Sequence, residues 1–172
     1  KKPTALKYSS LRIKSGDIEN LRSGFIRIPP EDCNNGVHTW NKNDLGLIQR
    51  YESVKISSGR GVPITLPNSD STRSLTLMST GDTTSFEAPK GIKLPNLHSL
   101  NISRAKISLN GLVRILNSAK NLNVLKIEFR DSGFAPNKEG EKEEQLNKRA
   151  LINLKSFKHD MKPNDLDLLQ SK

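Results

Sequence analysis

The chain has 172 residues, 33% of them hydrophobic and 5% aromatic, and its 28 Lys and Arg against 18 Asp and Glu give a formal net charge of +10. This length fits one ordinary domain, and so lean a composition favours an elongated shape in which each element contacts only its neighbours. The longest apolar runs are too short to span a bilayer, and the single cysteine, Cys33, excludes an internal disulfide framework and a cysteine-based zinc site.

In chain order, six short segments share a pattern in which two apolar residues stand two positions apart, which places both on one face of a strand. The segments are "YSSLRIK" (Tyr8–Lys14), "YESVKIS" (Tyr51–Ser57), "TRSLTLM" (Thr72–Met78), "LHSLNIS" (Leu97–Ser103), "LNVLKIE" (Leu122–Glu128) and the weaker "LKSFKHD" (Leu154–Asp160). The fourth residues of the last five segments follow one another at intervals of 21, 25, 25 and 32 residues; they are Val54, Leu75, Leu100, Leu125 and Phe157. Such spacing indicates a repeat architecture.

Segments with helical spacing of apolar residues lie between these strands. The clearest is Asn110–Asn121, with Asn110 as its predicted N-cap, and shorter helices are predicted at Gly16–Ser23, Asn43–Tyr51 and in the terminal "NDLDLLQSK". The segment Ser57–Ser71 is rich in Gly, Pro and Ser, so we expect a loop or an extended return there.

Two departures from the period are expected. The interval from Leu11 to Val54 is too long for one repeat, and an irregular repeat around residues 23–50 is predicted to fill it. In this repeat the strand-like "FIRI" ends at Pro29-Pro30, and the turn-forming "CNNGVH" indicates an outward loop. The charged "NKEGEKEEQLNK" around residues 137–148 is predicted to be an insertion after Pro136. We expect it to form a solvated loop or a short exposed helix, of the kind that often contacts partners.

This succession of strand, turn and helix resembles the leucine-rich-repeat family, whose signature is L-x-x-L-x-L-x-x-N/C-x-L. The match covers the aliphatic positions from Tyr8 to Asp160, but Lys106 and Asp131 stand where the family has Asn or Cys. The resemblance implies an α/β fold, with one leucine-rich-repeat solenoid over residues 1–172 that has a curved parallel sheet on its concave side and helices and loops on its convex side. The irregular period is similar to the ribonuclease-inhibitor-like and F-box subtypes. Because no end cap is evident, we expect a fragment of a longer protein.

The sequence offers no constellation of residues for catalysis. His38, His98 and His159 lack metal-ligand spacing, and neither a phosphate-binding P-loop nor a G-x-S-x-G elbow is present. We therefore expect a protein that is not an enzyme, with no catalytic residue, no cofactor, no metal site and no small-molecule substrate.

The residues that alternate with the aliphatic ones are predicted to lie on the open, concave face of the sheet. Small side chains there let a partner approach closely, and a neighbouring line of Lys can supply charge-assisted contacts to carboxylates or phosphates. The predicted partner-binding residues are Ser53, Lys55, Ser74, Thr76, Ser99, Asn101, Lys126, Glu128 and Lys158. The alternative is that these are ordinary solvated positions of a crowded sheet.

The resemblance implies a protein–protein interaction module of a larger complex, and the single cysteine favours an intracellular location, nuclear or cytoplasmic. In F-box ubiquitin ligases such repeats hold the substrate, and that role is the first hypothesis. One alternative is a nucleic-acid-associated factor that binds DNA or RNA phosphates through a basic concave face, and another is a pathogen-recognition or effector domain. The net positive charge fits an acidic partner or simple solubility, and no membrane partner is expected.

Overall fold

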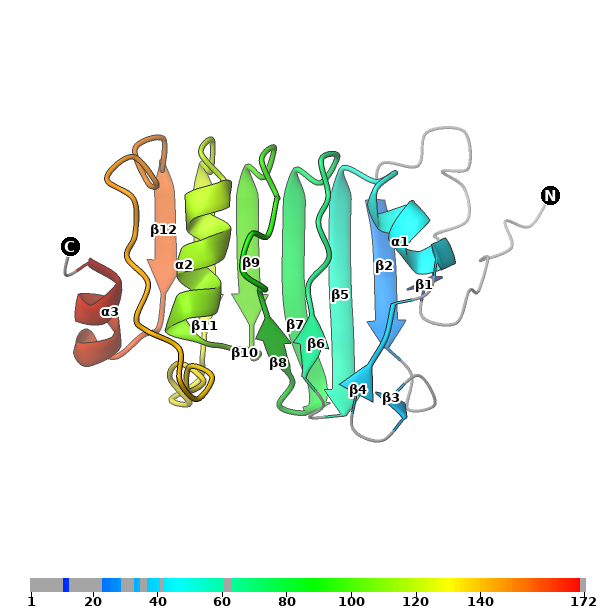
Figure 1. Cartoon of the computed structure of the whole chain (residues 1–172), viewed down its shortest axis with the longest axis horizontal. Coiled ribbons are helices and arrows are strands. Elements are labelled where there is room, and N and C mark those ends of the chain that lie inside the picture. The colour runs from blue at the N-terminus through cyan, green and yellow to red at the C-terminus, as the bar shows by residue number, and fades with distance from the viewer. Residues whose placement is uncertain are drawn as a thin grey trace.

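The computed structural model describes residues 11–12, 23–28, 33–34, 37–40, 42–60 and 63–170, and these form an α/β fold in two layers (Figure 1). One layer is a seven-stranded sheet with the strand order β1-β2-β5-β7-β9-β11-β12. Its strands are β1 (Leu11–Arg12), β2 (Ser23–Ile28), β5 (Ser53–Arg60), β7 (Ser74–Asp82), β9 (Ser99–Ser103), β11 (Val124–Glu128) and β12 (Ser156–His159). Neighbouring strands from β2 to β12 are parallel, whereas β1 is antiparallel to β2.

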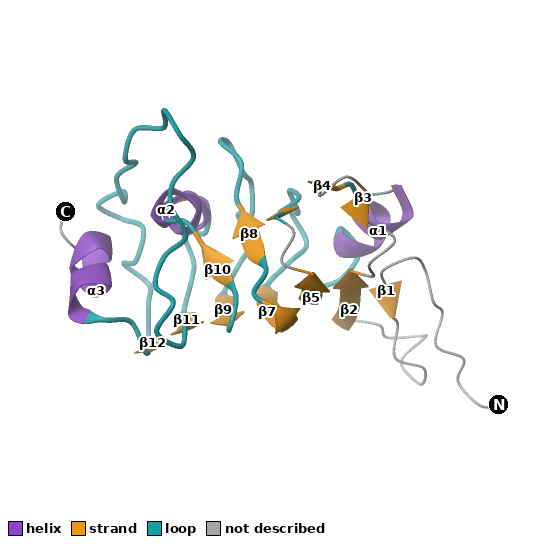
Figure 2. Ribbon diagram, turned by 90° about the horizontal axis from the view of Figure 1, so that it is seen from below, coloured by secondary structure: helices purple, strands orange, loops and turns teal. Residues whose placement is uncertain are grey.

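Figure 2 shows the other layer, which lies along one face of the large sheet. Its elements are α1 (Lys42–Ile48), β6 (Ile64–Thr65), β8 (Ser85–Glu87), β10 (Lys106–Ile107), α2 (Leu109–Ser118) and α3 (Pro163–Gln170). Strands β6, β8 and β10 form a small parallel sheet, and β3 (Cys33–Asn34) pairs in antiparallel fashion with β4 (Val37–His38). From β5 onward the chain alternates between the two layers, because a second-layer segment separates each strand of the large sheet from the next.

The core between the layers includes the aliphatic residues of the repeat pattern, together with second-layer residues such as Phe86 and Leu112. Val54, Leu75, Leu100 and Leu125 are at most 4% exposed, and each is in register with the next. Burying one such side chain contributes about 1.5–3 kcal/mol. The alternation of buried and less buried residues along β9 and β11 therefore gives the sheet one strongly apolar face, against which the second layer packs.

The start of each strand from β7 to β12 repeats one hydrogen-bond arrangement. A single carbonyl oxygen just before one strand accepts hydrogen bonds from the N–H groups of two successive residues at the start of the next strand, at donor–acceptor distances of 2.7–3.0 Å. The acceptors are Glu52 (from Arg73 and Ser74), Arg73 (from His98 and Ser99), His98 (from Asn123 and Val124) and Asn123 (from Lys155 and Ser156). Successive strands consequently begin at the same level, and the five strand predictions from Tyr51 onward are confirmed.

The first repeats contradict one prediction and confirm another. The segment around Leu11 does not begin the parallel series, because β1 runs antiparallel to β2. The strand-like "FIRI" segment is confirmed as part of β2, which pairs in parallel with β5. Gly24 pairs with Val54 and Ile26 with Ile56. A glycine thus occupies the position where the pattern requires an aliphatic residue, so β2 does not match the repeat pattern although it joins the same parallel series.

The helix predictions fare better. The helices predicted at Asn43–Tyr51 and near the C-terminus are confirmed as α1 and α3, and the extended return predicted after β5 contains β6. Helix α2 is also confirmed, but its N-cap is Ser108, whose Oγ accepts a hydrogen bond from Gly111 N at 2.9 Å. Asn110 is therefore not the cap; it is fully buried in the first turn. Of the helix predicted at Gly16–Ser23, residues 16–22 lie outside the described residues and Ser23 begins β2.

The charged insertion around residues 137–148 is a loop with mostly exposed residues, and it is hydrogen-bonded to α2. Asn110 donates from Nδ2 to Lys142 O at 2.9 Å and accepts on Oδ1 from Glu144 N at 2.8 Å. One turn later in α2, the Arg114 guanidinium pairs with Glu141 at 3.2 Å and with Glu144. The hydrogen bond from Asn110 and the charge of Arg114 lower the pKa of Glu141. The prediction of a solvated loop is confirmed, because most residues of the segment are exposed, and polar groups of α2 hold this loop in place.

Candidate interaction surface

The nine predicted partner-binding residues lie on the face of the large sheet opposite the second layer, here called the open face. They alternate along β5, β7, β9, β11 and β12 with the buried core residues. The register aligns Ser53, Ser74 and Ser99 in one column and Lys55, Thr76, Asn101, Lys126 and Lys158 in the next. The fold thus brings the predicted residues together, while their binding of a partner stays a prediction.

The first column of the open face is low and partly apolar. Ser53, Ser74 and Ser99 are half-buried, and the next position in the register is Val124, which is 39% exposed. Adjacent strands lie about 4.8 Å apart, so these side chains form a continuous strip across the sheet. Because none of them is long, a partner can approach the backbone of the sheet closely along this strip.

The second column becomes basic toward β12. Lys126 and Lys158 are both exposed and are directly paired in the register, and among the described residues neither has a carboxylate partner. Two like charges on neighbouring strands repel each other in the free protein. An anionic partner would relieve this repulsion, which makes this end of the open face the more attractive one for a carboxylate or phosphate.

Asn101 lies in the middle of the same column, between Thr76 and Lys126 in the register. Its Oδ1 atom is buried and accepts no hydrogen bond from any described residue. A buried acceptor without a donor is rare in folded proteins and costs about 1–3 kcal/mol.

Glu128 differs from the other predicted residues because its carboxylate is already engaged. Its Oε1 accepts from Arg130 Nε at 3.1 Å and lies 3.7 Å from Arg104 Nε. The two arginines border a cavity of about 260 Å³ at the ends of β7, β9 and β11, together with hydroxyl groups such as those of Ser79 and Thr83. Glu128 therefore orients two cations at the margin of the open face and is not itself free for a cationic partner.

Sequence reasoning missed Arg104 and Arg130. Both follow their strands and adopt positive φ angles of 56° and 49°, a conformation that non-glycine residues seldom adopt. Arg104 is the first residue after β9 and Arg130 the second after β11, so they share no position in the repeat pattern. Their common feature in the sequence is a basic residue just beyond a strand, which is too general to identify a site.

No protein-family model, no curated protein and no solved structure matches this chain. Within the part of the chain that the structure describes, no three His, Cys, Asp or Glu side chains are grouped to hold a metal ion. In the same part, no helix combines the length and the apolar character needed to cross a membrane. The chemistry of the open face itself is thus the basis for assigning a function.

Proposed function

We propose that this chain is a protein–protein interaction module of the leucine-rich-repeat type, a solenoid that holds an acidic segment of a partner protein against its open face. The in-register strands, the four repeated carbonyl arrangements and the layer of return segments support the solenoid. The proposed role is recognition rather than catalysis.

The observation that carries this proposal is the pairing of a low strip of small side chains with a basic column beside it. Ser53, Ser74 and Ser99 leave room for an extended chain, and Lys126 and Lys158 supply positive charge at one end of it. Charge-assisted bonds from Lys to carboxylates are roughly twice as strong as those between neutral groups. The partner chemistry that fits is an extended peptide with small or apolar residues and carboxylates toward the β12 side.

The test is charge reversal on the open face. Lys126→Glu with Lys158→Glu should leave thermal unfolding almost unchanged, because both side chains are exposed, and should abolish capture of partner proteins by the immobilised chain. The matched control, Lys42→Glu with Lys162→Glu, changes the net charge equally at exposed positions outside the large sheet. If the two double variants capture the same proteins, the open face is not the binding site.

A specific context follows from the family resemblance. In F-box ubiquitin ligases, repeats of this kind hold the substrate while a separate F-box recruits the ligase core, and we propose the same division of labour here. Affinity purification of the full-length protein should then recover ligase-core subunits together with substrates. Recovery of substrates without any ligase-core subunit would remove the F-box context and leave the interaction module standing.

The same basic column also favours a second candidate function, binding of nucleic-acid phosphates. Each neutralised phosphate releases counterions, so the affinity for a labelled oligonucleotide would fall steeply with added salt. A binding constant that depends weakly on salt, or the absence of oligonucleotide binding, would exclude this candidate. Steep salt dependence that disappears in the Lys126→Glu, Lys158→Glu variant would establish it in place of the first.

A further inference from the structure

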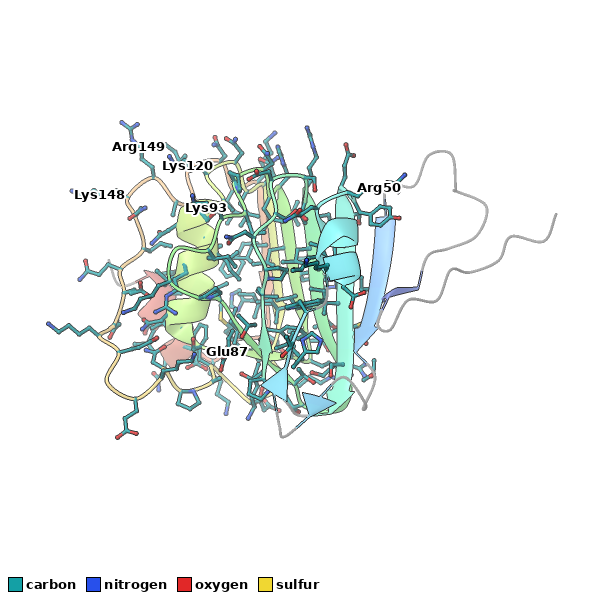
Figure 3. The ribbon with its side chains drawn as sticks, turned by 45° about the vertical axis from the view of Figure 1, so that its right-hand side comes forward. Arg50, Glu87, Lys93, Lys120, Lys148 and Arg149 are labelled. Carbon is teal, nitrogen blue, oxygen red and sulfur yellow. The ribbon has the colours of Figure 1, made fainter. Side chains whose placement is uncertain are left out.

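A cavity of about 430 Å³ lies at the edge of the molecule where β11 and β12 begin, away from the open face. Three segments line it: the end of α2 with the turn that follows, the turn that ends the charged insertion, and the residues that lead into β12. Figure 3 shows Lys120, Lys148 and Arg149 at this edge, with Lys93 from the preceding coil nearby. We call this the edge cavity.

All the charged side chains that line the edge cavity are positive. Lys120, Lys148 and Arg149 contribute to its wall, no Asp or Glu does, and none of the three forms an ion pair with a described residue. The helix dipole explains Lys120, because a cation is favourable beside the C-terminus of α2. It does not explain Lys148 and Arg149. Three uncompensated cations around one cavity raise the local potential and attract an anionic ligand.

Hydrogen bonds to α2 fix the backbone of the turn that carries Lys148 and Arg149. Asn117 donates from Nδ2 to Gln145 O at 3.0 Å and accepts on Oδ1 from Asn147 N at 2.7 Å. Ala150 N donates to Asn147 O at 3.0 Å, and the Ala150 side chain is buried. Lys148 and Arg149 therefore project from a turn whose backbone is anchored at both ends, so less backbone entropy is lost when a ligand binds.

The edge cavity also contains an apolar contact point. Ile152 lines it and is 70% exposed, more than any other large hydrophobic side chain among the described residues. No aromatic residue lines the cavity, so it lacks the stacking platform on which proteins commonly hold nucleic-acid bases. Cations next to one exposed aliphatic side chain, in a concave site, match a peptide that carries carboxylates and an aliphatic residue.

We propose that the edge cavity binds an acidic segment of a protein partner. Carboxylates of the segment pair with Lys148 and Arg149, where the arginine can bind one of them in bidentate fashion, and an aliphatic side chain covers Ile152. This site is separate from the open face and does not depend on the function proposed for it. A partner could occupy both, in which case the second contact becomes intramolecular and strengthens the first.

The probe is a short fluorescein-labelled peptide composed of glutamates with one central leucine, titrated with the full chain by fluorescence anisotropy. Lys148→Glu with Arg149→Glu should weaken binding by about tenfold or more, since a close attractive pair is replaced by a repulsive one. Lys42→Glu with Lys162→Glu alters the net charge by the same amount at exposed positions outside both the edge cavity and the open face, and should change the affinity less than about twofold. Equal losses in both double variants, or no binding of the peptide, would overturn the proposal.

A second variant separates the apolar contact from the charge. Ile152→Ser should weaken the leucine-containing peptide but leave an all-glutamate peptide unaffected, and an equal effect on both would show that Ile152 makes no contact with the ligand. The same titrations with a labelled oligo-dT and with phosphatidylserine vesicles test other polyanions. Tighter binding of either one than of the peptide, lost in the Lys148→Glu, Arg149→Glu variant, would reassign the cavity to nucleic acid or to lipid.

Discussion

The return segment between β7 and β9 and the one between β11 and β12 make the same connection in different ways. The first comprises residues 83–98, and the second, with its charged insertion, comprises residues 129–155. In the first, β8 pairs with both β6 and β10, and further backbone bonds such as Lys106 N to Thr84 O at 2.9 Å join neighbouring coils. The short return thus has a framework of main-chain pairing, which almost every sequence supplies, and side-chain bonds such as Leu94 N to Ser118 Oγ at 2.7 Å add to it.

The long return makes few main-chain hydrogen bonds to neighbouring segments. Ala135 N donates to Ile107 O at 2.9 Å and extends the small sheet by one bridge, and beyond this point the insertion depends on α2. Three side chains project from successive turns of α2 and bind the backbone and the carboxylates of the insertion: Asn110, Arg114 and Asn117. The comparison teaches that the short return is secured by periodic backbone pairing, whereas the long one relies on the identity of three side chains.

The largest effect should come from a change that both return segments share, the apolar core beneath them. Leu100 in β9 is fully buried, and in Leu100→Asp the carboxylate would have no partner there. The expected loss of about 5 kcal/mol or more is comparable to the whole stability of a typical domain, so circular dichroism should show an unfolded chain.

The control for this prediction is Val124→Asp, in the strand that pairs with β9. Val124 is 39% exposed on the open face, so the new carboxylate reaches water and the variant should fold. A Leu100→Asp variant that unfolds at the wild-type temperature would contradict the assignment of the two faces of the sheet.

The difference between locally periodic features and contacts of distant side chains explains how much of the structure the sequence could predict. The five parallel strands from β5 to β12 follow from the spacing of residues such as Leu75 and Leu125, because period-2 alternation is a local property and their burial is its direct consequence. At β2 the strand-like "FIRI" was evident, but the repeat pattern did not extend to it because Gly24 provides no side chain at the core position that pairs with Val54. What was predictable is therefore the repeated part of the core and the column arrangement of the open face.

The long return could not be predicted for a different reason. Asn110 was interpreted as an N-cap because Asn is common at that position, and nothing local distinguishes this role from binding a segment about 30 residues further along the chain. The edge cavity is similar, because Lys120 and Arg149 are brought together only by the docking of the insertion. Contacts between distant polar residues leave no periodic trace in a single sequence.

Substitution of Arg114 should have the next-largest effect on stability, and it should loosen the long return more than the short one. Its side chain is only 10% exposed and joins Glu141, Glu144 and, through Nη1 at 2.9 Å, the carbonyl oxygen of Ala88. Arg114→Met leaves these acceptors without their cation, which should cost about 2–3 kcal/mol in the free energy of unfolding. Hydrogen exchange measured by mass spectrometry should accelerate within residues 137–148 and much less within β8.

The control for Arg114 is another arginine that pairs with a carboxylate. Arg104 is 53% exposed and lies 3.7 Å from Glu128, so Arg104→Met should change the free energy of unfolding by less than about 0.5 kcal/mol. Equal destabilisation by the two substitutions would mean that the buried ion pairs are not what holds the insertion.

Two asparagines sharpen the comparison at a smaller scale. Asn110→Ala removes the buried amide that bonds Lys142 and Glu144, and we expect a loss of about 2 kcal/mol because these backbone groups lose their partner in a desolvated site. Asn96→Ala removes an exposed bond to Asp70 O at 2.5 Å in the short return, where water replaces the amide, and should cost less than about 1 kcal/mol. Chemical denaturation of both variants measures the difference, and a larger loss for Asn96→Ala would reverse the ranking of the two returns.

The smallest effect concerns the protonation of Glu141. The hydrogen bond from Asn110 and the charge of Arg114 lower its pKa in the folded protein below the ordinary value of 4.5. The folded state therefore binds a proton less readily than the unfolded state, and the resulting stabilisation is complete above about pH 4.5 and is lost as the pH falls through the lowered pKa. An NMR titration of the Glu141 carboxyl group should give a midpoint below 4.5 in the wild type and a higher one in Asn110→Ala. The same midpoint in both proteins would show that the amide of Asn110 does not stabilise the carboxylate, and that the lowered pKa arises from Arg114.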